Sequence, residues 1–402
     1  MKIACVGGGP AGLYLAILTK ARVPEHDVTV FERNPPGVTH GWGVVFWDDL
    51  VEQLEASDPA TASAIRSSSF SWNGQLLAIG DEDVVHVGWR GYGIGRRRLL
   101  DVLVERARTL GVRVEFQSEI GSPDELRADL IVASDGVNSP IRQLRPERFR
   151  THVVTGRNKY IWLGTNRVFD AFTFAFVHTE AGWIWCHAYG FDAETSTFIV
   201  ECSPETWAGL GFDQLGESDT LRRLERIFER HLQGHALKSK ARAQDRAAWL
   251  NFRTVTNASW HADNIVLLGD AAHTTHFTIG SGTRLALEDA ISLAAMLKSE
   301  TSLAVALEQY ETQRQRALLR TQSDARLSAQ WYENVPRYLD LAPPKVFALM
   351  NERRSPLLPH IPPAVYYQLY RAMRSNRVLR KLRKWIVPPV KGVCSRAARG
   401  AM

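Results

Sequence analysis

The chain has 402 residues, of which 45% are hydrophobic and 23% charged, with a formal net charge of +6, as in globular proteins that bury a full core. No apolar run approaches the roughly 18 residues of a membrane-spanning helix, and the N-terminus enters a strand pattern without a signal-peptide h-region. The cysteines Cys5, Cys186, Cys202 and Cys394 lack metal-ligand spacing, so we expect no metal site and reduced thiols in a cytoplasmic protein.

The first 33 residues predict a βαβ unit with a dinucleotide-binding turn. The apolar run at 2–6 precedes GGGPAG, a helical pattern, and a second strand at 28–33. Gly7, Gly9 and Gly12 match GxGxxG, and Glu32 follows Gly12 by 20 residues. Gly7 permits the tight turn, Gly9 admits a pyrophosphate, and Gly12 allows close helix–strand packing, while Glu32 is placed to bind a ribose. The expected cofactor contacts also include Pro10, Ala11 and Arg33. The turn alone does not separate NAD from FAD.

Beyond this unit the residue pattern changes twice. A helix beginning at Arg96 is followed by strands, one of which ends in the polar turn Asp135-Gly136. Between residues 158 and 202, segments rich in aromatic and β-branched residues predict antiparallel strands. A buried-strand pattern returns at 263–273, and amphipathic helices follow it.

These patterns predict an α/β protein with a discontinuous GxGxxG Rossmann-like domain, an inserted antiparallel substrate sheet and C-terminal helices. We expect the dinucleotide-binding domain at 1–150 and 251–335, the substrate domain at 151–250, and a C-terminal helical segment at 336–402.

The stretch 267–290, LLGDAAHTTHFTIGSGTRLALEDA, joins a predicted strand to an amphipathic helix. Gly269 and Asp270 end the strand, and the sequence Gly280, Ser281, Gly282, Thr283 opens the helix, whose N-terminal amides favour anions. Alone, the stretch fits a His/Asp catalytic pair, a phosphate-binding turn, or an ordinary strand-to-helix connection.

Three motifs occur in order over most of residues 1–300: GxGxxG with Glu32, ASDGVNSPIR at 133–142, and Gly269-Asp270. In this combination the chain resembles the single-component FAD-dependent aromatic hydroxylases, the p-hydroxybenzoate hydroxylase-like family. The resemblance implies that Asp135 lies near the flavin pyrophosphate and that Asp270 binds the ribityl and phosphate region. It also implies that Arg96, in R-x-x-L-x-x-x-L, contacts FAD.

Further segments narrow the resemblance. ERNPPGVTHGWGVVF, GRNKYIW and HFTIGSGT are similar to the salicylyl-CoA 5-hydroxylase, anthraniloyl-CoA monooxygenase and violacein-pathway tryptophan-derivative hydroxylase group. Phe277 and Arg284 stand where the wider family has proline and asparagine, departures that the group shares. Several CoA-thioester members carry an additional Old Yellow Enzyme-like half, which these residues do not include, so we expect hydroxylation without ring reduction.

The resemblance also implies the chemistry. NADH or NADPH would visit transiently, because no second dinucleotide fold is visible, and O2 would form a C4a-hydroperoxyflavin that hydroxylates an electron-rich aromatic ring. We expect an aromatic acyl-CoA such as salicylyl-CoA or anthraniloyl-CoA as substrate; the alternative is a free indole or aryl intermediate of secondary metabolism. A flavin halogenase is disfavoured because His187 and Ala188 replace Ile and Pro of its W-x-W-x-I-P signature, and the separated family signatures disfavour a non-catalytic flavoprotein.

Several residues keep two interpretations. His276 is either the base that deprotonates the substrate or a structural histidine bonding the loop backbone. His187 and Tyr189 alternate along one strand and share a face that is either substrate pocket or core. Trp42 is either a pocket wall or a surface-covering aromatic residue, and we include Phe277 in the expected substrate pocket.

The basic character of the chain is concentrated at its end. From 371 to 402 there are ten Lys or Arg and no Asp or Glu, which leaves residues 1–370 with a net charge of −4. A solvated helix explains this pattern, as does a patch for an anionic substrate handle or a membrane surface. We expect no nucleic-acid partner, since no recognisable module accompanies the basic residues, and we expect a monomer or homodimer.

Overall fold

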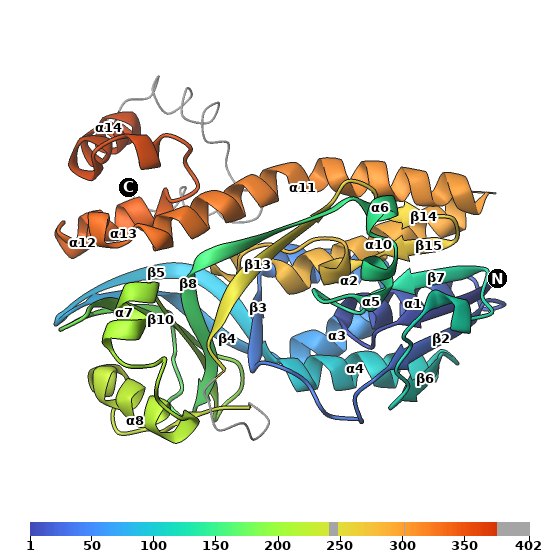
Figure 1. The fold of residues 1–402 in the computed structure, drawn as a ribbon, viewed down its shortest axis with the longest axis horizontal. Helices are drawn as coiled ribbons and strands as arrows, with labels where there is room; N and C mark the ends of the chain where they lie inside the picture. Colours follow the sequence, from blue (N-terminus) through green and yellow to red (C-terminus); the bar gives the residue numbers. More distant parts are fainter. Residues whose placement is uncertain (241–247, 301, 376–402) are drawn as a thin grey trace.

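The computed structural model describes residues 1–240, 248–300 and 302–375, and it confirms the predicted α/β class. Two sheets lie beside each other along the longest axis, and a layer of C-terminal helices covers one side (Figure 1). The basic segment that follows residue 375 lies outside the described residues; Arg371 and Arg374 at its start belong to the last described helix.

The smaller sheet is parallel apart from one edge strand, and its apolar strands are buried because helices cover it. Its spatial order is β14 (His261–Ala262), β15 (Ile265–Leu267), β7 (Leu130–Ala133), β1 (Lys2–Val6), β2 (Asp27–Glu32) and β6 (Arg113–Phe116). Helix α1 (Pro10–Arg22) packs against α4 (Arg96–Thr109) and α10 (Gly282–Ser299). This is the predicted Rossmann-like arrangement.

The larger sheet is antiparallel except where β4 pairs with β9. Its order is β12 (Leu237–Lys238), β8 (Thr151–Thr165), β11 (Ser196–Cys202), β10 (Gly182–Gly190), β9 (Phe172–Thr179), β4 (Phe70–Ile79), β5 (Glu82–Gly95) and β3 (Gly43–Phe46), with β13 (Leu250–Asn257) paired to β8. Strands from 43–95 therefore join a sheet that we expected from 151–250 alone. The domain limits themselves stay a prediction.

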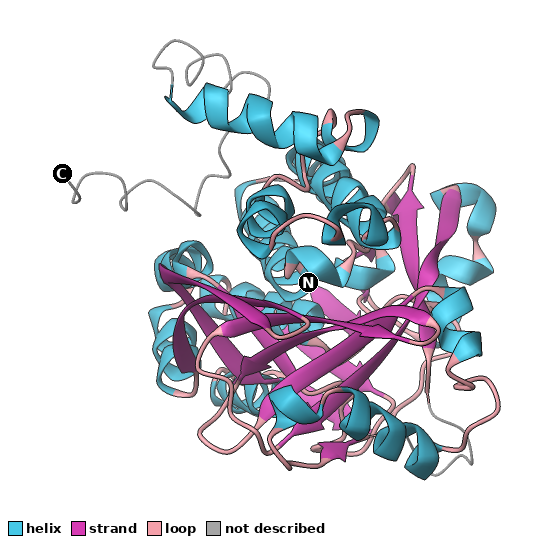
Figure 2. Ribbon diagram, turned by 90° about the vertical axis from the view of Figure 1, so that its left-hand side faces the viewer, coloured by secondary structure: helices cyan, strands magenta, loops and turns pink. Residues whose placement is uncertain are grey.

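The two faces of the larger sheet pack differently because side chains alternate along each strand. One face carries an apolar core with Ile184, Phe198 and Val200, which α8 (Glu217–Ile227) covers. The opposite face carries Tyr160, His187 and Glu201. Figure 2 shows the sheet as a curved layer with helices on both sides.

Helix α11 (Leu303–Glu333) spans the length of the molecule and contacts both sheets (Figure 1). Its C-terminal half packs with α12 (Pro336–Leu339) and α13 (Pro343–Asn351) against strands β4, β9 and β10. The α-helices that remain are α2 (Asp48–Ser57), α3 (Pro59–Ser67), α5 (Pro140–Leu144), α6 (Pro146–Phe149), α7 (Pro204–Gly209), α9 (Glu229–Leu232) and α14 (Pro363–Ser375).

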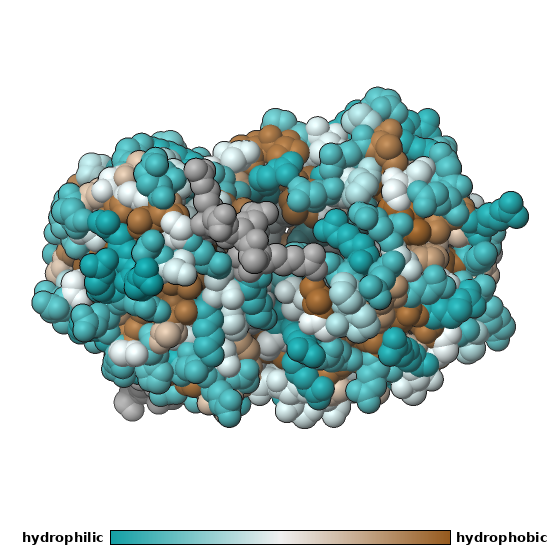
Figure 3. Space-filling model, turned by 60° about the horizontal axis from the view of Figure 1, so that its bottom comes forward, coloured by the Kyte–Doolittle hydropathy of each residue, from teal (hydrophilic) through white to brown (hydrophobic). Residues whose placement is uncertain are grey.

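Within the described residues, four short 3-10 helices connect these elements: η1 (Pro123–Glu125), η2 (Gly269–Ala271), η3 (Phe277–Ile279) and η4 (Leu358–His360). None of the helices in the described ranges has the length and hydropathy of a membrane span. The face in Figure 3 is mainly hydrophilic, with scattered hydrophobic side chains and a hollow near its middle.

Candidate active site

Of the three motif glycines in the glycine-rich turn, only Gly9 faces open space. Gly7 has φ +109°, and a Cβ there would lie 2.3 Å from the carbonyl oxygen of Ser134 at the end of β7. A Cβ on Gly12 would lie 2.4 Å from both the Gly7 carbonyl oxygen and Ser134 Oγ. A Cβ on Gly9 would meet no atom within 4 Å. Gly7 and Gly12 thus close the strand–helix packing, whereas Gly9 faces the room that a pyrophosphate needs.

Glu32, at the end of β2, is held in place and keeps acceptor capacity. Its Oε2 accepts a hydrogen bond from Gly8 N at 2.8 Å, and its Oε1 accepts from Asn34 N and Nδ2. A carboxylate has about four acceptor positions, so one remains for a ribose hydroxyl. The neighbouring Arg33 is exposed, Pro10 begins α1, and Ala11 is buried under the turn.

The second motif leaves a carboxylate oxygen without a partner. Asp135 Oδ2 accepts from Ile141 N at 3.4 Å, while its buried Oδ1 has no hydrogen bond among the described residues. Burial raises the pKa of Asp135. A buried acceptor of this kind calls for a polar ligand or water. Arg142 links the second and third motifs by donating to the carbonyl oxygens of Val137 and Ala271.

Asp270, in η2, and Arg96, at the start of α4, lie within electrostatic reach of each other. Both side chains keep solvent-accessible surface, yet burial raises the pKa of Asp270 and lowers that of Arg96, and their mutual attraction opposes both shifts. Arg96 Nε donates to Thr39 Oγ1 at 3.2 Å, and no direct ion pair joins the two charges in the part of the chain described. Opposite charges that flank a gap suit a polar chain carrying both acceptors and hydroxyls.

Asp289 fixes the third motif, and the sequence analysis missed it. From α10 its carboxylate accepts hydrogen bonds from Gly269 N at 3.2 Å, His273 Nε2 at 2.8 Å and Arg314 Nε at 2.7 Å. Although burial raises its pKa, His273 and Arg314 lower it below the ordinary value. The sequence did contain a signal for Asp289. It lies four residues after Leu285, on the buried face of an apolar helix, where a carboxylate is unusual unless it is paired.

The N-terminus of α10 remains available to a ligand. Ser281, at its N-cap, makes no side-chain cap, and a Cβ on Gly282 would meet no atom within 4 Å, so no capping side chain occupies the first turn of α10. Gly280 takes φ +61° just before it, where a Cβ would lie 2.7 Å from the ring of Trp47. Arg284, which replaces the asparagine of the wider family, donates to Glu288 Oε1 at 3.0 Å.

The loop that carries His276 and Phe277 packs against the inner face of the larger sheet. The Phe277 ring lies 4.9 Å from Tyr160 and 5.7 Å from His187, between ring centroids. The His276 ring stacks on Phe277 at 4.5 Å and contacts Phe252 at 4.7 Å. Three of the predicted site residues, His187, His276 and Phe277, therefore meet in one aromatic cluster.

His276 is neutral and locally bonded. Its Nδ1 lies 3.0 Å from Thr278 Oγ1 and accepts from Thr278 N at 3.5 Å, while Thr278 Oγ1 also contacts Ser328 Oγ of α11 at 2.9 Å. Burial lowers the pKa of His276 to about 4, against the attraction of Glu201. Because Nδ1 accepts from the backbone, the proton sits on Nε2. The hydrogen bond from the loop backbone is what a structural role of His276 requires. The neutral imidazole is also the form that a base needs in order to accept a proton, so both interpretations of His276 stand.

Glu201 is a functional candidate that the sequence analysis did not name. It is 1% exposed on β11 and accepts from Asn158 Nδ2 at 2.8 Å, Trp185 Nε1 at 3.1 Å and His187 Nε2 at 3.4 Å. Burial raises its pKa, but the hydrogen bonds from His187 and Asn158 bring the pKa below the ordinary value, so Glu201 is ionised. An ionised carboxylate only accepts, so Nε2 of His187 carries the proton of this bond.

Tyr160 belongs to this cluster and also interacts electrostatically with Asp270. Burial raises the pKa of Tyr160 to about 12, and the negative charges of Glu201 and Asp270 add to the shift. Tyr160 thus lies within electrostatic reach of both carboxylates. Two buried polar atoms close to the cluster, Asn158 Oδ1 and Tyr332 Oη, have no hydrogen-bond partner within the described ranges. Aromatic walls with a few unpaired polar atoms are typical of a small-molecule site.

Trp42 and Tyr189 lie further along the same sheet face. Tyr189 Oη donates to Gly43 O at 2.9 Å, and its ring stacks on Phe172 at 5.2 Å. Trp42 is half-buried over Gly164, where a Cβ would lie 2.4 Å from the indole, and Lys240 Nζ lies 4.5 Å from its ring centroid. These contacts of Tyr189 fit both a substrate pocket and a core position. The contacts of Trp42 fit both a pocket wall and a surface-covering aromatic residue.

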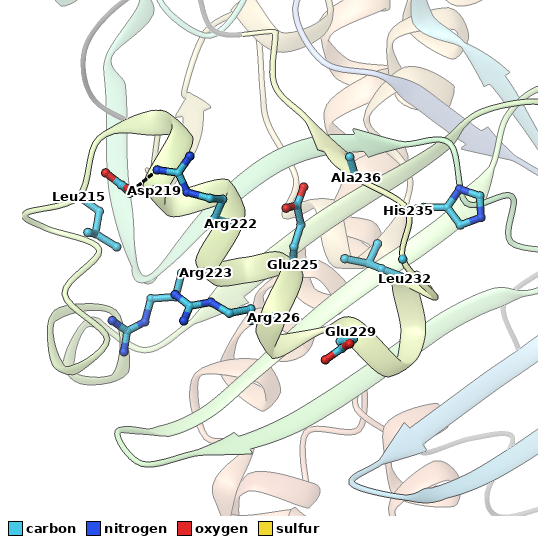
Figure 4. Close-up of a pocket in the computed structure, with 11 residues that line it drawn as sticks. Leu215, Asp219, Arg222, Arg223, Glu225, Arg226, Glu229, Leu232, His235 and Ala236 are labelled. Carbon is cyan, nitrogen blue, oxygen red and sulfur yellow. Dashed lines mark hydrogen bonds and ion pairs between the residues drawn. The ribbon is translucent and has the colours of Figure 1, made fainter.

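A groove of about 670 Å³ lies beside α8, away from these residues (Figure 4). Arg222, Arg223 and Arg226 alternate there with Glu225 and Glu229, and it adjoins the face of the sheet opposite His187. Its charges of both signs and its position separate it from the cluster around Phe277.

Comparisons with known proteins agree with this geometry. A family profile described as FAD binding domain matches residues 1–323. Salicyloyl-CoA 5-hydroxylase of a Streptomyces species is 39% identical over 349 residues, and the match covers 84% of this chain and 66% of that protein, slightly less than two thirds.

Two further relatives match over more of their length. A 5-monooxygenase of 3-hydroxy-4-methyl-anthranilyl aryl-carrier protein from Streptosporangium sibiricum is 34% identical, covering 84% of this chain and 90% of that protein. Protodeoxyviolaceinate monooxygenase of Chromobacterium violaceum is 31% identical, covering 93% and 100%. The fold is shared with 2-methyl-3-hydroxypyridine-5-carboxylic acid oxygenase, at a TM-score of 0.68, 21% identity, and coverage of 83% and 92%.

Proposed function

Because this chain belongs to the FAD-dependent aromatic monooxygenases, we propose that it uses NADH or NADPH and O2 to hydroxylate the ring of an aromatic CoA thioester, such as salicylyl-CoA or anthraniloyl-CoA. The observation that carries the proposal is the position of Phe277, whose ring lies 4.9 Å from Tyr160 and 5.7 Å from His187, between ring centroids. The loop that follows Gly269 and Asp270 thereby places an aromatic cluster with titratable groups close in sequence to the residues that suit the cofactor.

The residues of the three motifs suit successive parts of FAD. Gly9 and the start of α1 would hold the pyrophosphate, Glu32 the adenosine ribose, and Asp135, Asp270 and Arg96 the remaining polar chain. The amides that open α10 would face the anionic edge of the flavin ring. When bound and reduced, FAD supplies an activated oxygen atom for the aromatic ring.

The protein's own contribution would be orientation and proton management. A ring activated by OH or NH2 reacts faster as its proton leaves, so a neutral acceptor beside it assists the reaction. We assign this role to His276 or His187, the two imidazoles of the cluster, with Glu201 as the positioning residue that accepts the His187 Nε2 proton. Phe277, Trp42 and Tyr189 would form the aromatic walls.

The alternative substrate is a free indole or aryl intermediate, which the likeness to the Chromobacterium enzyme supports. In either case we expect a small aromatic partner and a monomer or homodimer. We also propose a cytoplasmic enzyme, in keeping with the free, buried state of Cys5, Cys186 and Cys202.

The test is a screen of NADH and NADPH consumption by the purified flavoprotein. Salicylate, anthranilate and tryptophan derivatives would be compared with the CoA thioesters of the two acids, and products would be checked for one added oxygen. Acceleration by the thioesters with a hydroxylated product supports the proposal. Acceleration by a free indole alone supports the alternative and contradicts the thioester.

A further inference from the structure

A continuous chain of hydrogen bonds connects the C-terminal layer to the ring of His276. Arg353, just after α13, donates from Nε to Ser328 Oγ of α11 at 3.0 Å. Ser328 Oγ lies 2.9 Å from Thr278 Oγ1, which in turn lies 3.0 Å from His276 Nδ1. The chain therefore joins three segments that are distant in sequence, and it ends at one nitrogen of one imidazole.

The two ends of the chain fix the direction in which its protons point. A guanidinium group only donates, so Ser328 Oγ accepts from Arg353. A backbone N–H also only donates, so the bond from Thr278 N at 3.5 Å makes His276 Nδ1 an acceptor. Ser328 is fully buried, and Thr278 Oγ1 is the acceptor that the described residues offer to its hydroxyl proton. Thr278 then donates its own hydroxyl proton to His276 Nδ1.

Arg353 anchors the start of the chain to the loop backbone as well. Its Nη1 donates to Met350 O, near the end of α13, at 2.7 Å, and its Nη2 donates to Thr278 O at 3.1 Å. One guanidinium group thus holds the carbonyl group of Thr278 directly and, through Ser328, its hydroxyl group. Because these bonds act together, the loop cannot easily rotate the chain away from His276.

The other nitrogen of the His276 ring is the one left for a ligand. Burial lowers the pKa of His276 to about 4, so the ring carries one proton near neutral pH, and an accepting Nδ1 leaves that proton on Nε2. His276 keeps 8% of its surface exposed, and Nε2, which makes no hydrogen bond with any described residue, is not one of the fully enclosed polar atoms. The lone pair that could take up a proton, at Nδ1, is occupied by Thr278.

We propose that this chain keeps the proton of His276 on Nε2, so that His276 donates a hydrogen bond to an oxygen atom of the substrate and does not act as the base. The inference rests on the proposed function and narrows it, because the base role then falls to His187. A phenolic oxygen or a thioester carbonyl oxygen accepts such a bond, whereas the N–H groups of an indole or an aniline only donate. Thr278 and Ser328 are positioning residues, since they act through His276.

The role of His276 is tested in the FAD-loaded full chain with His276→Gln and His276→Leu. The amide NH2 of glutamine donates but takes up no proton, whereas leucine does neither. A donor role predicts that His276→Gln keeps the single-turnover hydroxylation rate within about threefold of the wild type and that His276→Leu weakens substrate binding about tenfold. A loss of about 10²–10⁴-fold in rate in His276→Gln would make His276 the base and overturn the proposal.

Two thioesters distinguish the possible acceptor oxygens. Binding of salicylyl-CoA and anthraniloyl-CoA is measured from the change in flavin absorbance; both carry the thioester carbonyl, but the phenolic oxygen is present in salicylyl-CoA alone. In His276→Leu, a loss confined to salicylyl-CoA identifies the phenolic oxygen, and an equal loss for both identifies the carbonyl. Unchanged binding of both thioesters, or a loss confined to anthraniloyl-CoA, overturns the donor role.

The chain itself is tested without turnover, by two-bond proton–nitrogen correlation spectra of the holoprotein labelled with ¹⁵N-histidine. His276→Gln assigns the His276 signals. We expect a proton on Nε2 in the wild type and a mixture of tautomers in Thr278→Val. Thr275→Val is the matched control, because Thr275 is a buried threonine of the same loop whose hydroxyl has no partner within the described ranges. A wild-type ring protonated on Nδ1, or an unchanged tautomer in Thr278→Val, overturns the proposal.

Thermal melting and flavin content check that each variant folds, and Ser328→Ala, which interrupts the chain one step earlier, replaces Thr278→Val if that variant does not. The two proposals fail separately. If neither thioester binds, the substrate assignment is wrong, and the tautomer spectra alone decide whether the chain holds the Nε2 proton. If an aryl-CoA is hydroxylated but His276→Gln loses the rate, the function stands and the donor role is wrong.

Discussion

Replacing Glu201 by Gln tests whether the buried carboxylate sets the proton position on His187. The change keeps the shape of the side chain and removes its charge and one acceptor. The amide oxygen can still accept from Asn158, but its NH2 group then faces the N–H groups of Trp185 and His187. His187 relieves this conflict by moving its proton from Nε2 to Nδ1, whereas the indole N–H of Trp185 has no such alternative.

Two magnitudes follow from these contacts. A buried donor left unpaired costs about 1–3 kcal/mol, so we expect the free energy of unfolding to fall by about 2 kcal/mol and the variant to remain folded. With its proton on Nδ1, His187 can no longer accept there. General-base assistance contributes about 10²–10⁴-fold to a rate, so hydroxylation should slow by about 100-fold if His187 is the base.

The assay separates a positioning role from a structural one. Stopped-flow measurement of flavin reduction by NADH or NADPH should match the wild type, while the ratio of product formed to cosubstrate oxidised should fall. Glu205→Gln is the control, because Glu205 lies beyond the end of the same strand and pairs with Arg157 on the surface. An unchanged product ratio in Glu201→Gln would refute the role, whatever its stability.

Three further predictions concern the cofactor and the loop. Gly9→Ala should leave the melting temperature of the apoprotein unchanged but weaken FAD binding. Gly12→Ala should lower the melting temperature of the apoprotein, because its Cβ would lie 2.4 Å from Gly7 O. Equal effects of the two variants in both assays would contradict this prediction. The pKa of His276 is about 4 in the folded protein and about 6.5 in the unfolded chain. The neutral histidine therefore contributes its full share to the free energy of unfolding above pH 6.5. This contribution is lost on acidification towards pH 4 and amounts to about 3 kcal/mol. Urea unfolding at pH 7 and pH 4.5 should show a smaller loss for His276→Gln than for the wild type. Asp289→Asn breaks the pairing of buried Arg314, so the free energy of unfolding measured in urea should fall by about 3–5 kcal/mol. The variant should also bind less flavin. A full flavin content would contradict the role of Asp289 in holding Gly269.

The cofactor side of the molecule was predictable because its signals are local. GxGxxG, the acid 20 residues later, and the Gly-Asp turn each specify a conformation within a few residues. The parallel sheet then brings the ends of β1, β7 and β15 to one edge, as the alternation of strands and helices predicted. The α/β class, the FAD-binding domain and the family resemblance are confirmed.

The polar side of the pocket was not predictable because its partners are distant in sequence. Glu201 bonds Asn158 across 43 residues and Trp185 across 16, and only the strand register places the three together. A lone Glu in STFIVECS reads from sequence as a solvent-facing residue of an alternating strand. The sheet instead buries both faces of β11, so the same alternation carries a charge into the interior. Strands β3, β4 and β5 were missed for a related reason, since β4 joins the larger sheet through a long-range parallel contact with β9, and β5 and β3 extend the sheet from β4.

The loop between η2 and α10 is held by two separate sets of contacts. Thr278 is fixed by Ser328 and Arg353, which lie beyond residue 323, where the family profile ends. Gly269, which precedes the predicted cofactor ligand Asp270, is fixed instead by Asp289 within the profile. Because Thr278 directly follows Phe277, a change in the C-terminal layer would act on His276 and Phe277 before it acts on the turn at Gly269 and Asp270.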